Sequence, residues 1–348
     1  MPQKEGWAIL NVNPTARLGL LASVLILLTV TFGAVTAQQI SFLRIGTGST
    51  AGTYYPIGTL LASVISNPPG SRACESGGSC GVPGLIATAQ TTHGSVDNIS
   101  GVSKGVFETA LAQSDVVAAA FNGTGIYAKK KPVKSLRVIA NLYPEDVHLV
   151  VRHDAGIKNV KDLKGKRVSI DVPGSGTREN AKQILRAYGL STKDIDAITA
   201  VPDKAVSLML ADKLDAFFIV AGYPVTAVSE LADVGKIDLL PISGKIIDDF
   251  VAKHGYYSVS DIPEGTYAGV GAIPTLAVST QWIVDADTPE DLVYAITQAL
   301  WNNRNRHLLD RGHAKGLLIH LDTATKGVSI PLHPGAARYY KEVGVLTD

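Results

Sequence analysis

One glycine-rich stretch places hydroxyl side chains where a turn could bind an anion. Pro173–Thr177 (PGSGT) follows the β-branched stretch 167–172 and precedes apolar residues at helical spacing. A turn that opens a helix leaves backbone N–H groups unpaired at the positive end of the helix dipole. Together with the hydroxyls of Ser175 and Thr177, these N–H groups could hold an anion. An ordinary strand-to-helix turn of an α/β domain explains this stretch equally well.

A second stretch repeats this pattern near the start of the chain. Gly46–Pro56 (GTGSTAGTYYP) follows a predicted strand and precedes a predicted helix. Its glycine spacing differs by one residue from the dinucleotide-binding fingerprint, and no acidic residue ends a second strand about 20 residues later. No lysine follows, as a phosphate-binding P-loop requires. The pattern therefore predicts hydroxyl and amide groups that line a cleft, with Tyr54 or Tyr55 as an aromatic wall.

The residues that catalysis requires are not grouped in this sequence. The eight histidines are scattered, and none has the spacing of metal ligands. Gly77–Gly81 matches the G-x-S-x-G pattern of hydrolases, but it lies in a Pro/Gly-rich loop instead of a strand-to-helix turn. Only His93 and Glu179 are acid–base candidates near the two turns. These observations predict a binding protein without a metal or cofactor, and an exported enzyme remains the alternative.

Alternating strands and helices with short links must position the two turns. The alternation predicts an α/β fold with a mostly parallel sheet that is covered on both faces. A helix is expected over 99–112, and Tyr143–Asp146 (YPED) is expected to separate two strands. The expected strands are 40–45, 85–92, 136–142, 147–152, 167–172, 195–201, 214–221, 237–242 and 275–283, and the main helices are 57–65, 177–188, 203–211, 225–231, 291–304 and 335–341.

The first 37 residues have the pattern of a secretory signal peptide. Leu18–Val35 is almost wholly apolar, and Val35-Thr36-Ala37 resembles a cleavage site, so export to the periplasm with cleavage after Ala37 is expected. An uncleaved membrane anchor is the alternative. Removal of this segment takes two of the 32 basic and one of the 31 acidic side chains, so the remainder has no net charge. This balance does not favour nucleic acid as a partner.

The two cysteines of the chain, Cys74 and Cys80, lie close together in a Pro/Gly-rich loop. A disulfide is the default for such a pair in an exported protein, and it would stabilise the fold by about 2 kcal/mol. A metal site would need more ligands than this loop offers.

Several blocks of the chain form motifs in sequence order: 45–56, 113–115, 142–145, 162–169, 173–177, 217–222 and 331–336. These blocks resemble the TAXI group of solute receptors, which serve TRAP-type secondary transporters. One departure is Ala51, which stands where this group usually has glycine, and Cys74–Gly84 looks like an insertion carried by one branch. No lipobox cysteine follows the signal, so a receptor without a lipid anchor is expected.

The resemblance implies a two-lobed, type II periplasmic-binding-protein fold that closes on its ligand by a hinge. The first lobe would contain 38–147 and 276–348, the second lobe 148–275, and 147–152 and 275–283 would cross between them. The ligand would be a small carboxylate, either a glutamate-like amino acid or a C4–C5 dicarboxylate such as 2-oxoglutarate. A monomer that delivers this ligand to TRAP membrane permease subunits is expected. A protein that presents ligand to a membrane sensor would share the same binding chemistry.

The resemblance also implies which residues would contact the ligand, with a ligand carboxylate on the N–H groups of 174–177. Arg178 is adjacent to this turn, but a cation there opposes the helix dipole, so a solvated side chain is expected. The first lobe would offer Gly48, Ser49, Tyr54, Asn98, Gln113 and Ser114, and the second lobe Ser175, Gly176, Thr177, Ala221 and Gly222.

Overall fold

The computed structural model describes residues 40–347 of the chain. The predicted signal peptide, residues 1–37 with cleavage after Ala37, lies outside the described residues. Among the helices of 40–347, none is both long and apolar enough to cross a membrane.

A ten-stranded sheet runs through the described part of the chain in the order β4-β1-β5-β12-β6-β9-β7-β8, with β10 on β6 and β11 on β12. Strand pairs are parallel at both ends of this order and antiparallel wherever β6 or β12 takes part. The expectation of a mostly parallel sheet is therefore right for the two ends and wrong for the middle. The strands are β1 (Ser41–Gly46), β4 (Leu85–Gln90), β5 (Thr109–Gln113), β6 (Leu136–Arg152), β7 (Arg167–Ser169), β8 (Asp196–Ile198), β9 (Ala216–Ala221), β10 (Ile237–Leu240), β11 (Tyr257–Ile262) and β12 (Ile273–Asp285).

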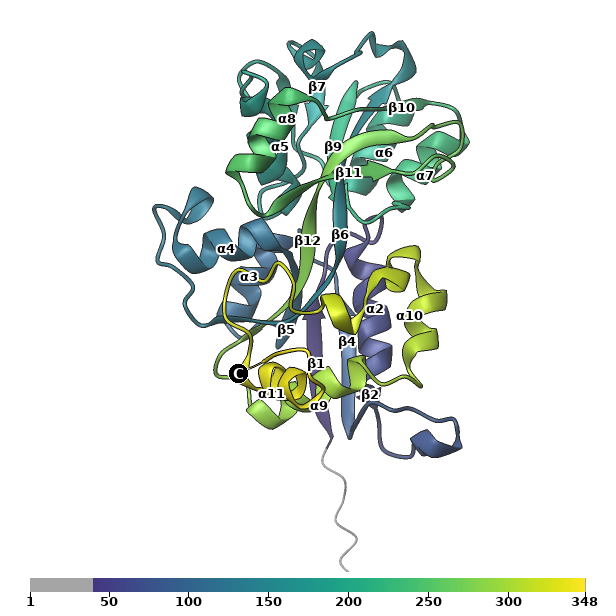
Figure 1. Ribbon diagram of the computed structural model, residues 1–348. Coiled ribbons are helices and arrows are strands. Elements are labelled where there is room, and N and C mark those ends of the chain that lie inside the picture. The colour runs from purple at the N-terminus through teal and green to yellow at the C-terminus, as the bar shows by residue number, and fades with distance from the viewer. Residues whose placement is uncertain (1–39, 348) are drawn as a thin grey trace, which may run out of the picture. The chain divides into compact units, whose positions relative to one another are not determined.

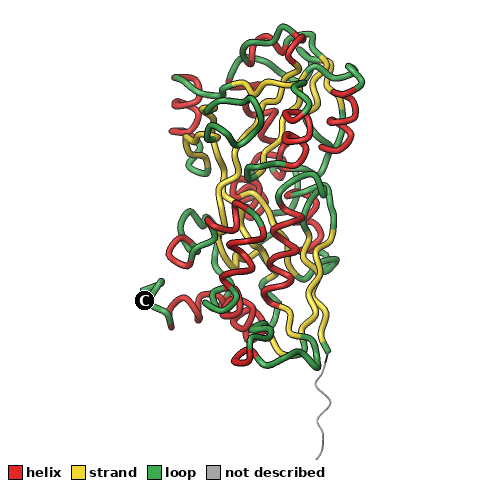
Figure 2. Tube along the Cα trace, turned by 90° about the vertical axis from the view of Figure 1, so that its right-hand side faces the viewer, coloured by secondary structure: helices red, strands yellow, loops and turns green. Residues whose placement is uncertain are grey.

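Helices cover the sheet in two lobes, which β6 and β12 connect (Figure 1; helices red and strands yellow in Figure 2). Lobe 1 contains β1, β4 and β5 with α2–α4 and α9–α11, and lobe 2 contains β7–β10 with α5–α8. This arrangement confirms the predicted two-lobed α/β fold. The helices are α2 (Tyr54–Ile65), α3 (Ser95–Ser103), α4 (Ser114–Asn122), α5 (Gly176–Ala187), α6 (Pro202–Leu210), α7 (Thr226–Asp233), α8 (Lys245–Lys253), α9 (Glu290–Leu300), α10 (Arg306–Gly312) and α11 (Pro334–Glu342).

Each lobe has its own apolar core. In lobe 1, Ile57 of α2 and Tyr340 of α11 pack in one cluster with Trp282 of β12. In lobe 2, Leu185 of α5 and Phe218 of β9 belong to another cluster. Separate cores allow each lobe to keep its structure when the lobes move as units about connecting strands.

The connection through β6 differs from the prediction. The sequence predicts two strands separated by Tyr143–Asp146, whereas β6 continues through these residues as one strand of 17 residues. Pro144 has no N–H to donate, but it lies opposite Ser279, where the pairing with β12 shifts its register. Such an irregularity accommodates proline inside a sheet. The predicted lobe limits, 147/148 and 275/276, fall inside β6 and β12, and they stay predictions.

The segment 99–112, which the sequence predicts as one helix, contains the end of a helix, a turn and the start of a strand. Helix α3 ends at Ser103, and Gly105 then adopts a positive φ of 68°, which glycine tolerates, before β5 begins at Thr109.

The predicted disulfide is confirmed, since Cys74 and Cys80 are bonded in the loop between the short strands β2 (Ser66–Asn67) and β3 (Val82–Pro83).

Candidate functional site

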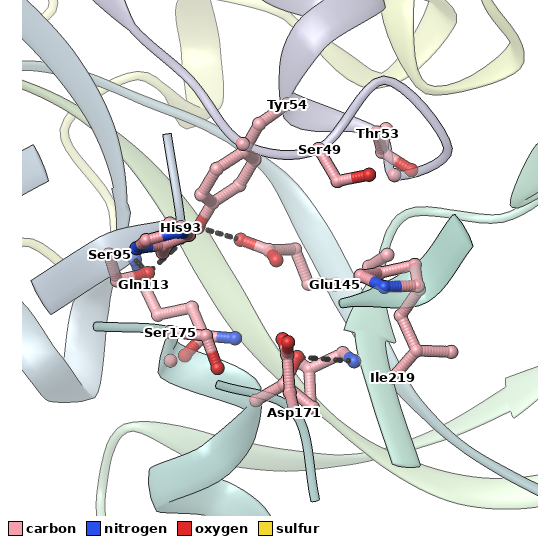
Figure 3. Close-up of a pocket in the computed structure, with 18 of the residues that line it drawn as sticks. Ser49, Thr53, Tyr54, His93, Ser95, Gln113, Glu145, Asp171, Ser175 and Ile219 are labelled. Carbon is pink, nitrogen blue, oxygen red and sulfur yellow. Dashed lines mark hydrogen bonds between the residues drawn. The ribbon is translucent and has the colours of Figure 1, made fainter. Parts of the chain in front are cut away.

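A small cavity of about 60 Å³ lies between the lobes, at the carboxyl ends of several strands. This is the place where ligands bind in open α/β sheets. Figure 3 shows the side chains that point into it from both lobes. Of the residues predicted to contact a ligand, those that line the cavity are Gly48, Ser49, Tyr54, Gln113, Ser175, Gly176, Thr177 and Ala221.

The three remaining predicted residues, Asn98, Ser114 and Gly222, lie outside this lining. The Asn98 side-chain amide donates to the carbonyl oxygens of Thr47 and Leu111, at 2.6 and 2.7 Å, and so joins the first turn to β5. Ser114 is the buried first residue of α4. The carbonyl oxygen of Gly222 accepts a hydrogen bond from the Thr53 hydroxyl. Ligand contact by these three residues stays a prediction.

The turn before α5 lies where the sequence suggests, but the helix begins at Gly176 with Ser175 as its N-cap, whereas the sequence pattern suggests Thr177 for that position. The Ser175 hydroxyl caps the helix by accepting the N–H of Arg178 at 3.0 Å, and the Thr177 hydroxyl accepts the N–H of Val220 at 3.0 Å. The N–H groups of Gly176 and Thr177 belong to the first helical turn and have no partner within the helix. Whether these two N–H groups hold an anion stays a prediction.

Arg178 differs from the solvated side chain that the sequence suggests. Its guanidinium is partly buried and donates to the carbonyl oxygen of Asp171 at 2.8 Å. This contact fixes the shape of the turn, and Arg178 is not part of the cavity lining.

Hydrogen bonds between the lobes surround the cavity. The N–H groups of Val96 and Asp97, at the start of α3, both donate to the carbonyl oxygen of Gly174 in lobe 2, at 3.0 and 3.1 Å. The Asn180 amide of α5 donates to the carboxylate of Asp115 on α4 at 2.8 Å. These contacts join the lobes directly, so the structure is a closed state.

A buried carboxyl group that the sequence does not predict, Glu145 of β6, points into the cavity (Figure 3). One of its oxygens, Oε1, accepts the hydroxyl of Tyr54 at 2.7 Å and that of Thr280 at 2.6 Å. Glu145 is only 1% exposed. Burial raises the pKa of Glu145 to about 8, more than its hydrogen bonds lower it, so the group is largely protonated at neutral pH.

Asp171 is a second carboxyl group in the cavity that the sequence does not predict as a site residue. It follows β7 with a positive φ of 66°, and one oxygen accepts the N–H of Val172 at 2.8 Å. Burial raises the pKa of Asp171 to about 6. Its position after a strand of the sheet is a signal that could have identified it, because polar groups at such ends meet in the ligand crevice.

The acid–base candidates for an enzyme are not brought together. His93 lines the cavity and pairs with Asp97 at 2.8 Å, whereas Glu179 pairs with Lys182 at 2.9 Å outside the lining. Within 40–347, no group of histidine, cysteine and acidic residues could hold a metal ion. The cavity lining itself includes neither lysine nor arginine. The arrangement offers hydrogen-bond donors and acceptors for a small polar ligand.

Part of the chain is similar to a curated protein. The arginine-binding extracellular protein ArtP of Bacillus subtilis (strain 168) is 31% identical over 112 residues, which are 32% of this chain and 40% of that protein. The chain therefore matches less than half the length of this curated relative.

Solved structures also resemble the chain, at low sequence identity. The alkanesulfonate-binding protein SsuA of Xanthomonas axonopodis pv. citri is 18% identical, with a TM-score of 0.47 and coverage of 89% of this chain and 86% of that chain. PhnD1 of Prochlorococcus marinus, solved with methylphosphonate, is 10% identical, with a TM-score of 0.49 and coverage of 88% and 99%. The model of the NMT1-like family matches residues 45–344, which is most of the chain. The chain belongs to the NMT1-like family.

Proposed function

We propose that this protein is a periplasmic solute receptor that captures a small carboxylate by closing its lobes. The observation that carries the proposal is the cavity that both lobes line and around which they exchange hydrogen bonds. A ligand that contacts both lobes stabilises the closed state, because it binds that state better than the open one. Such a ligand is small, since the cavity measures about 60 Å³.

The donors in the cavity favour a ligand with a carboxylate. The N–H groups of Gly176 and Thr177 lie at the positive end of α5, and the hydroxyl of Ser95 lines the same cavity. A glutamate-like amino acid and a C4–C5 dicarboxylate both offer such a carboxylate. Neither a cofactor nor an acid–base pair is required for this role.

We propose TRAP permease subunits as the partner to which this protein delivers its ligand. The resemblance of the sequence to TAXI receptors supports it, since the shared motifs run from 45–56 to 331–336. Among them, 173–177 and 113–115 include residues that line the cavity. Closure places surfaces of both lobes in one fixed arrangement, which a permease could distinguish from the open receptor.

Ligand-induced stabilisation tests the proposed function. We expect at least one C4–C5 carboxylate or acidic amino acid to raise the unfolding temperature of the purified protein. A ligand at 100 times its dissociation constant stabilises the folded state by about 2.7 kcal/mol. Neutral sugars of similar size serve as the control and should have no effect. The proposed ligand class is wrong if no acid in such a panel shifts the unfolding temperature.

A further inference from the structure

One group of hydrogen bonds between the lobes centres on a buried carboxyl group, that of Asp115 in the first turn of α4. Its Oδ2 atom accepts the side-chain amide of Asn180 at 2.8 Å and the hydroxyl of Tyr257 at 2.9 Å. The same amide also donates to the Tyr257 hydroxyl, at 2.7 Å. Asn180 lies on α5, and Tyr257 of β11 packs in the apolar core of lobe 2. These three side chains, the Asp115 cluster, therefore come together when the lobes close.

Two oxygens of the Asp115 cluster lack a hydrogen-bond donor. They are Oδ1 of Asp115 and Oδ1 of Asn180, and both atoms are buried. Asp115 is only 7% exposed, and Asn180 is 0% exposed. A buried acceptor without a donor costs free energy. A proton on Asp115 reduces this cost, because a protonated carboxyl group is a donor as well as an acceptor.

No cation compensates a negative charge on Asp115. Within 40–347, both side chains that donate to its carboxyl group, Asn180 and Tyr257, are neutral. Lys182 of the neighbouring α5 pairs with Glu179 instead, at 2.9 Å. Burial raises the pKa of Asp115 more than the hydrogen bonds from Tyr257 and Asn180 lower it. An ionised Asp115 is therefore unfavourable between closed lobes, and separation of the lobes relieves it by letting water reach the carboxylate.

The titratable groups around Asp115 come from both lobes and from the connecting strand β6. Asp115 raises the pKa of Glu145, the buried acid of the ligand cavity, so each of these two acids disfavours ionisation of the other. A groove of about 570 Å³ lies beside the Asp115 cluster. The charged and titratable side chains that line this groove with Asp115 are Glu179, Lys182 and Arg186 of α5, and His254, Tyr256 and Tyr257.

We propose that closure of the lobes takes up a proton at Asp115, so that ionisation of this residue favours the open receptor. This proton uptake goes beyond the proposed function, because it does not depend on which ligand the cavity binds. At a pH below the ordinary pKa of an aspartate, Asp115 is protonated in both states. As the pH rises from there to the raised pKa of the closed state, the ratio of closed to open protein falls by up to tenfold per pH unit. Above the raised pKa this dependence ends.

Small-angle X-ray scattering of the purified protein, dialysed and without added ligand, measures closure between about pH 4.5 and 8. We expect the radius of gyration of the wild type to increase with pH over this range. Asp115→Asn resembles the protonated acid in shape and in having both a donor and an acceptor, but it does not ionise. This variant should therefore be more compact than the wild type at pH 8, and the difference should shrink towards pH 4.5.

Asp248→Asn, at an exposed position of α8, is the matched control and should follow the wild type. Glu145 and Asp171 are present in all three proteins, so the difference between them isolates Asp115. Circular dichroism verifies that each variant is folded.

Tyr257→Phe provides a second test that does not alter Asp115 itself. Loss of its hydroxyl removes one donor to the ionised carboxylate, so the opening transition should move to a higher pH. A hydrogen bond that only joined the lobes would instead make the variant less compact at every pH, and that result would overturn the inference.

A larger radius for Asp115→Asn than for the wild type at pH 8 would also overturn it, because the closed lobes would then require a carboxylate. Equal radii of these two proteins at every pH would do the same. Either result would leave the proposed function standing, since the panel of small carboxylates tests that function separately.

Discussion

Gly176→Ala is expected to weaken ligand binding strongly while each lobe stays folded. A Cβ atom at Gly176 would lie 1.9 Å from Gln113 Oε1 and 2.8 Å from Ser95 Oγ, and both of these atoms belong to the opposite lobe. Such distances are shorter than van der Waals contact, and Gln113 is buried and cannot simply turn away. The lobes must therefore separate, and overpacking of about 1–3 kcal/mol corresponds to a loss of about 5- to 150-fold in affinity.

Calorimetric titration of the ligand and small-angle scattering together test this prediction. Scattering should show a larger radius of gyration for the variant in the presence of ligand. Gly271→Ala is the matched control, because a Cβ atom there has no neighbour within 4 Å, and its affinity should equal that of the wild type. Wild-type affinity of Gly176→Ala would show that the closed arrangement is not the state that binds ligand.

Lys315→Met is expected to lower the free energy of unfolding by about 3–5 kcal/mol. Lys315 Nζ lies 3.0 Å from Asp146 Oδ2, and the two side chains are only 1% and 0% exposed. The Lys315 ammonium also lies 3.4 Å from the centre of the Tyr223 ring in lobe 2. Removal of this cation leaves the Asp146 carboxylate buried without its charged partner, which is more costly than loss of the contact alone.

Chemical denaturation at two pH values tests this prediction. The loss should be smaller near pH 5 than near pH 7, because burial raises the pKa of Asp146 and a protonated Asp146 carries no unpaired charge. Arg338→Met is the control, since Arg338 pairs with Glu290 and Asp291 at the surface, and it should cost less than about 1 kcal/mol. Equal losses in the two variants would contradict a structural role for the buried pair.

The sequence is sufficient to predict features that depend on neighbouring residues. The Gly174–Thr177 turn is recognisable because strand, glycine turn and helix follow one another directly. The alternation of elements predicts the α/β class for the same reason. Cys74 and Cys80 are so close in sequence that their pairing needs no knowledge of the fold.

Features that depend on distant segments could not be predicted in this way. Pro144 suggests a break between strands, and only its pairing with Ser279 of β12 shows that β6 continues and carries Glu145 into the cavity. Likewise, the bonds from Val96 and Asp97 to Gly174 join segments about 80 residues apart, and no local pattern indicates them. The place of Glu145 in the cavity therefore appears only once these distant pairings are known.

Native mass spectrometry of the gently purified protein tests the central claim most directly. Denaturation of the same sample then releases any bound molecule for identification by its mass. The account predicts a small carboxylate, bound at one molecule per chain. A protein that carries no small molecule, and that binds neither amino acids nor other small carboxylates when they are added, would contradict it.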